Sequence, residues 1–137
     1  MQPSPEIEQI LGQAHKIAAG KNHEYVTVEH ITLALVKHSK FKRCIDSYGS
    51  SSVAIATDLE LFIDSQAMLV SSAKKKDPKK TNALERVFNR ALTQVMFSGR
   101  REMATIDLWL AIMAENNSHA SYFMLKHGLD KKEFTMH

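Results

Sequence analysis

Four histidines recur at intervals of seven or eight residues early in the chain, at His15, His23, His30 and His38. This spacing suggests metal ligation. However, the four fall on two predicted helices and a loop, and no carboxylate pair has ligand spacing with them. Adventitious binding of zinc or nickel to surface histidines is the alternative. We therefore predict no physiological metal site and no cofactor.

The one thiol and the known catalytic motifs also argue against an enzyme. Cys44 falls on the apolar face of a predicted helix, where we expect a buried structural thiol rather than a nucleophile. The sequence contains no G-x-x-x-x-G-K-[ST], G-x-S-x-G or H-E-x-x-H motif. With no catalytic constellation in view, we expect the chain to act by binding.

Five lysines cluster between Val70 and Lys80, at Lys74–Lys76 and Lys79–Lys80. The cluster has no interleaved aromatic residues that could stack on bases, so a solvated linker is predicted. Phosphate contact is the weaker alternative, which would make the chain a basic helical nucleic-acid-binding protein. The formal charge of +3 and the pI of about 9.0 permit acidic partners without establishing nucleic-acid binding.

Nearly all the remaining sequence has helical periodicity, because apolar residues recur every three or four positions. Gly20, Gly49 and Gly128 offer helix stops. The pattern predicts an all-α chain of about eight helices. Candidate N-caps precede these helices at Ser4, Thr27, Ser39, Ser51 or Ser52, Thr81, Thr105, Ser118 and Asp130.

The order of helices indicates an internal repeat. A constant offset, which places Ile7 on Leu84, aligns the two halves without a gap from residue 5 to 36. A two-residue insertion in the second half then brings Gly49 onto Gly128. We expect repeat one at about 5–67, the Lys-rich linker at about 68–80 and repeat two at about 81–137. Each half alone has a marginal core, so one domain spanning 1–137 is predicted, with two four-helix repeats related by a pseudo-two-fold axis.

The composition is that of an ordinary globular protein. Of the 137 residues, 44% are apolar and 24% charged, and the single cysteine cannot form an internal disulfide. The first residues lack the basic and apolar segments of a signal peptide, and no apolar run is long enough to span a membrane. We expect a cytoplasmic protein without membrane contact.

Two segments carry a more specific signal. They are H-E-Y-V-T-V-E-H-I-T-L-A-L at His23–Leu35 and T-N-A-L-E-R-V-F-N-R-A at Thr81–Ala91, the second followed by S-G-R at Ser98–Arg100. Together with the repeat, they resemble the N-terminal (Clp N) domain of AAA+ protein unfoldases, closest to the ClpA type. The resemblance implies a non-catalytic docking domain that receives a ClpS-type adaptor and protein substrates for ATP-dependent proteolysis.

The resemblance also implies an adaptor-binding site around the start of the second and fifth helices. Glu24, Glu29 and Arg86 are expected to face solvent, whereas the sequence alone favours helix capping over recognition for the two threonines at this site, although a residue can do both. By position, the implied contacts are Glu24, Thr27, Val28, Glu29, Thr81 and Arg86.

Three features depart from the family pattern. Thr32 stands where an aliphatic residue is usual, and its hydroxyl is expected to bond to a carbonyl of its own helix. The Lys-rich linker is unusually basic, and the eighth helix is short. The short end leaves two possibilities: a domain of a longer unfoldase that contacts the ATPase ring, or a free-standing regulator that competes for the adaptor. In either case the domain itself is expected to be monomeric.

Overall fold

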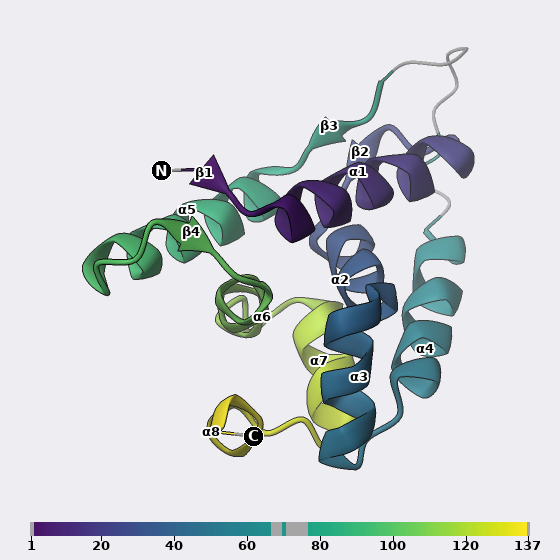
Figure 1. The fold of residues 1–137 in the computed structure, drawn as a ribbon. Coiled ribbons are helices and arrows are strands. Elements are labelled where there is room, and N and C mark those ends of the chain that lie inside the picture. The colour runs from purple at the N-terminus through teal and green to yellow at the C-terminus, as the bar shows by residue number, and fades with distance from the viewer. Residues whose placement is uncertain (1, 67–69, 71–76, 137) are drawn as a thin grey trace.

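The computed structural model describes residues 2–66, 70 and 77–136 (Figure 1). Helices dominate it, which confirms the predicted all-α class, and no helix among these residues has the length and hydropathy needed to cross a bilayer. The elements in chain order are β1 (Gln2–Pro3), α1 (Pro5–Gly20), β2 (Tyr25–Val26), α2 (Val28–Lys37), α3 (Ser39–Tyr48), α4 (Ser52–Asp64), β3 (Lys79–Lys80), α5 (Asn82–Phe97), β4 (Glu102–Met103), α6 (Thr105–Met113), α7 (His119–Lys126) and α8 (Lys131–Met136).

Most of the predicted caps hold their helices. The side chains of Ser4, Thr27, Thr81 and Ser118 each accept the backbone N–H three residues ahead, as an N-cap should. Ser51, rather than Ser52, caps α4. At the other ends, Gly49 closes α3 in the left-handed conformation (φ +107°), which explains why a glycine stands there.

Two predicted caps are wrong by one residue. Ser39 is the first residue of α3, and His38 occupies the N-cap position without a side-chain hydrogen bond to the first turn of the helix. Thr105 likewise begins α6, and the cap is Ala104, whose N–H donates to Asp107 Oδ2 at 2.8 Å. In the second case an acidic side chain reaches back to the start of the helix, so the helix begins without a polar residue at its N-cap.

The strands make the pseudo-two-fold relation visible. β1 of the first repeat pairs in parallel with β4 of the second, and β3 of the second pairs in parallel with β2 of the first. The offset that aligns the repeats carries the pair Gln2–Glu102 onto the pair Lys79–Tyr25. Each repeat therefore gives the segment before its first helix to the other repeat.

This exchange corrects the predicted linker. Lys79 and Lys80 form β3, and the N–H groups of Lys79 and Thr81 donate to the carbonyls of Glu24 and Val26. Tyr25–Val26 is the partner strand. Most of the remaining linker, including Lys74–Lys76, lies outside the described residues.

The core is continuous across both repeats. α2 lies at its centre, packs against α1, α3, α4, α6 and α7, and buries eight of its ten residues. Within it, the Thr32 hydroxyl donates to the Val28 carbonyl at 2.7 Å, as predicted. Cys44 is exposed, so the prediction of a buried thiol is wrong: the short helix α3 buries only Phe41 and Ile45.

Candidate docking groove between the repeats

A groove of about 340 Å³ lies where the N-termini of α2, α5 and α7 meet. Thr27, Thr81 and Ser118 cap these three helices, so both repeats contribute to its walls. Unsatisfied N–H groups in the first turns give this end of each helix a partial positive charge. The lining residues are Thr27, Val28, Glu29, Thr81, Ala83, Arg86, Glu115, Asn117, Ser118 and His119.

Five of the six residues expected at an adaptor site line this groove. Thr27 and Thr81 are half-buried at its rim, and Val28, at 3% exposure, supplies apolar surface from within. Glu24 does not line it; its side chain is exposed one residue before β2. Residues from distant parts of the sequence are thus brought into one concave site.

Glu29 does not face solvent as expected. It is half-buried, and its Oε2 accepts the N–H of Ala120 at 3.1 Å. Ala120 lies in the first turn of α7, so the carboxylate satisfies a free N–H group and complements the dipole of a helix in the other repeat. Glu29 therefore joins the two repeats at the groove.

Arg86 is exposed, as predicted, but it already has a partner within the chain. Its Nε and Nη2 each lie 3.3 Å from an oxygen of Glu115, and Arg90 Nη2 lies 3.2 Å from Glu115 Oε1. The hydrogen bonds from Arg86, with a smaller contribution from Arg90, lower the pKa of Glu115. Glu115 is thus ionised at neutral pH and holds Arg86 in a defined position on the groove wall.

A buried pair of histidines stands behind Thr27. The Thr27 N–H donates to His30 Nδ1 at 2.9 Å, so the proton of neutral His30 is on Nε2, which lies 2.9 Å from His23 Nδ1. The unprotonated nitrogen of each ring therefore already accepts a hydrogen bond. Burial, and then the charges of His23 and Lys21, lower the pKa of His30 to about 4.

Besides Ala83, four lining residues were not predicted as site residues: Glu115, Asn117, Ser118 and His119. They lie in the α6–α7 loop and the start of α7, far in sequence from the resembling segments, and carry no motif. His119 also stacks on Phe62, with ring centroids 4.0 Å apart. Only the folded chain brings this loop to the caps of α2 and α5.

The chemistry available in the groove is that of reversible recognition. It offers charged groups already fixed by internal partners, apolar surface from Val28 and Ala83, and the polar ends of helices. Among the described residues, no group of three or more histidine, cysteine or carboxylate side chains is arranged to hold a metal ion.

Comparison with known proteins agrees with the fold. The sequence profile of the Clp repeat (R) N-terminal domain matches residues 2–127. A ClpA homolog protein from Fuscovulum blasticum is 33% identical over 122 residues, which cover 88% of this chain and 15% of that protein. The chain thus spans about 15% of the length of this relative.

Solved structures show the same fold at low sequence identity. The N-terminal domain of Hsp104 from Candida albicans superposes with a TM-score of 0.85 at 9% identity, covering 99% of this chain and 88% of that one. The ClpV N-domain in complex with a VipB peptide gives a TM-score of 0.66 at 15% identity, covering 96% and 86%. The profile match over most of the chain and the ClpA homologue together show that this chain belongs to the Clp N-terminal domain family.

Proposed function

We propose that this chain is a docking domain of a Clp-type AAA+ unfoldase, and that the groove between α2, α5 and α7 receives a ClpS-type adaptor. The observation that carries the proposal is the convergence in this groove of Thr27, Val28, Glu29, Thr81 and Arg86 from both repeats. The complex of a ClpV N-domain with a VipB peptide supports peptide or protein docking by this fold.

The charges in the groove suggest how an adaptor is recognised. Arg86 is exposed on one wall and is held by Glu115, so an acidic group of the partner would meet a positioned guanidinium. Glu29 is committed to α7, and its role is to keep the groove assembled. Partly exposed charges of this kind set partner choice and association rate more than total affinity.

Calorimetric titration with a ClpS-type adaptor, using the matched variants Arg86→Gln and Arg90→Gln, tests the proposal. Each variant removes one guanidinium from Glu115, but only Arg86 lines the groove, whereas Arg90 faces the gap between α5 and α6. We expect Arg86→Gln to weaken adaptor binding about tenfold or more and Arg90→Gln to leave it near the parent value.

Two results would contradict the proposal. Absence of saturable binding by the parent chain would exclude a ClpS-type adaptor as the partner. Equal affinities of the two folded variants for the adaptor would exclude the groove as its binding site. Circular dichroism of both variants establishes that they are folded. Glu24→Arg then tests whether contact extends beyond the groove, since this exposed residue lies outside it. Glu29→Arg is unsuitable because it also removes the bond to α7.

A further inference from the structure

The exposed face of α5 is polar until its last two residues. Met96 is 67% exposed and Phe97 is 87% exposed. Large exposed apolar side chains that adjoin each other on a polar face mark interaction sites more often than isolated ones do. The exposed residues that precede them on this helix are Asn82, Glu85, Arg86, Asn89, Thr93 and Gln94.

The internal repeat shows that the fold does not need these two side chains. The offset that aligns the repeats brings Met96 onto Ala19 and Phe97 onto Gly20, and α1 ends at Gly20 just as α5 ends at Phe97. The first repeat thus forms the same helix end with almost no side chain. We call Met96 and Phe97 the knob; exposed Arg101 and Glu102 follow it in the chain.

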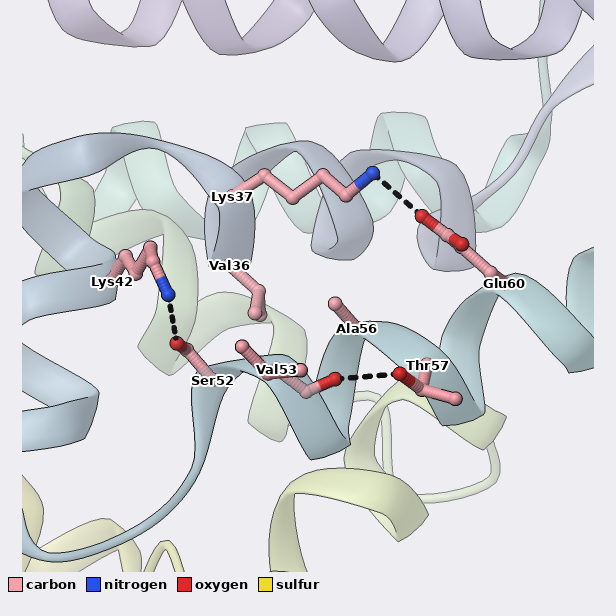
Figure 2. Close-up of a pocket in the computed structure, with 8 residues that line it drawn as sticks. All are labelled: Val36, Lys37, Lys42, Ser52, Val53, Ala56, Thr57 and Glu60. Atoms are coloured by element: carbon pink, nitrogen blue, oxygen red, sulfur yellow. Dashed lines mark hydrogen bonds and ion pairs between the residues drawn. The ribbon is translucent and has the colours of Figure 1, made fainter.

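A second groove, of about 420 Å³, lies between α2, α3 and α4 (Figure 2). Its apolar surface comes from buried Val36, half-buried Ala56 and Val53, which is 65% exposed. The ion pair between Lys37 Nζ and Glu60 Oε1, 2.6 Å apart, crosses one end of it.

The other end of this groove is polar as well. Lys42 Nζ lies 2.8 Å from Ser52 Oγ. It also lies 3.5 Å from Asp46 Oδ2. The equivalent of Val53 in the second repeat is Lys132. Gly49 aligns with Gly128, and Val53 and Lys132 follow these two glycines at the same distance along the chain. The exposed valine, like the knob, occurs in only one of the two repeats, so neither feature is required by the repeated fold.

We propose that the knob of one copy inserts into the α2–α3–α4 groove of a second copy. Both surfaces have an apolar centre, and the end of the groove crossed by the Lys37–Glu60 pair offers one cation and one anion, so Arg101 can face Glu60 while Glu102 faces Lys37. The groove volume lies in the range, upward of about 300 Å³, in which pockets enclose small molecules, so it has room for the two side chains of the knob.

The positions of the two surfaces decide the geometry of the contact. The C-terminal end of α5 and α4 lie on opposite sides of the molecule (Figure 1), so the knob cannot reach the groove of its own chain. Contact between copies is therefore head-to-tail, which produces rings or open chains rather than a closed symmetric dimer.

With two anchoring side chains the association is weak, with a dissociation constant on the order of millimolar, and a dilute chain is monomeric. Copies tethered to one assembly meet at about millimolar effective concentration, where such a contact is populated.

Sedimentation velocity and ¹⁵N relaxation, measured from about 10 µM to about 1 mM protein, test this inference. We expect the apparent mass to rise with concentration for the parent chain and to stay monomeric for Phe97→Ala and for Val53→Asp. An equimolar mixture of the two variants regains association but stops at dimers, because one supplies the groove and the other the knob. Leu61→Asp is the matched control: it lies on the same helix and is also 65% exposed, but it does not line the groove.

Three outcomes would overturn the inference. One is a parent chain that stays monomeric at about 1 mM, which would leave the knob for a different partner. Another is a mixture that fails to associate although both variants keep the parent circular dichroism spectrum. The third is a Leu61→Asp chain that loses association to the same extent as Val53→Asp.

Discussion

Acid should destabilise this domain through the buried pair His23–His30. Burial lowers the pKa of both histidines, that of His30 to about 4 from an ordinary value of 6.5. Between these two pH values the unfolded chain binds more protons than the folded one, so the free energy of unfolding rises with pH across this window. The stabilisation is complete above pH 6.5 and is lost as the pH falls toward 4.

The size of the effect follows from the two pKa values of His30. A difference of about 2.5 units corresponds to about 3 kcal/mol when the pH has fallen below both values, and about 2 kcal/mol of this is lost by pH 5. His23 shifts in the same direction and adds to the loss. Urea unfolding followed by circular dichroism at pH 7.5, 6.5, 5.5 and 5.0 measures it, and NMR titration of the imidazole protons identifies the residue.

The second repeat supplies the matched control. The offset that aligns the repeats carries His23 onto Arg100 and His30 onto Asp107, and Arg100 Nη1 donates to Asp107 Oδ2 at 2.8 Å. The same two positions thus hold a neutral hydrogen-bonded pair in one repeat and an ion pair in the other. The double variant His23→Arg/His30→Asp should fold and lose most of the pH dependence above pH 5. A parent chain whose stability is flat from pH 7.5 to 5, or a double variant with the parent slope, would refute the reasoning.

Three smaller effects can be checked by the same unfolding assay or by thiol labelling. Gly49→Ala should lower the free energy of unfolding by about 1 kcal/mol, because φ is +107° there. Gly12→Ala, inside α1 with nothing within 4 Å of the new Cβ, should raise it by about 0.5–1 kcal/mol. The reverse order of the two stabilities would contradict the backbone argument. Thr81→Ala should cost about 1 kcal/mol by removing the cap of α5, and Thr93→Ala, in the middle of that helix, close to nothing. Cys44 should react completely with a thiol reagent in the native protein, and protection until unfolding would show that it is buried.

Helices and their caps could be predicted from the sequence because their causes are local. The spacing of apolar residues determines which face of a helix is buried. A hydroxyl that accepts the backbone N–H three residues later in the chain determines where the helix begins, as at Ser4 and Ser118. The two errors at Ser39 and Thr105 arise where no hydroxyl caps the helix, since the N-cap residues are His38 and Ala104. At Ala104 the acceptor is a carboxylate one turn into α6. Exposure of Cys44 could not be predicted because it depends on which neighbours cover the short helix α3.

The candidate site was only half visible in the sequence. The segments around Thr27 and Thr81 are recognisable from the resemblance, but Glu115 and His119 enter the groove through tertiary packing alone. The solvent-facing role expected for Glu29 was wrong for the same reason, since its hydrogen-bond partner, Ala120, lies in the other repeat. Expectations about the adaptor and the domain limits remain predictions, because they concern partners and chain lengths rather than contacts within the chain.

The exchanged strands explain why a site of this kind lies between the repeats. The chain entering α5 is tied to β2, and β2 leads directly into α2, so the caps of both helices are held beside each other by two parallel backbone pairs. Glu29 then fixes the start of α7 to the same place. Neither repeat alone contains all three helix N-termini, so the groove exists only when both repeats are folded together. A substitution that weakens either repeat should therefore reduce docking before it unfolds the whole domain, because the groove depends on the contact between the repeats.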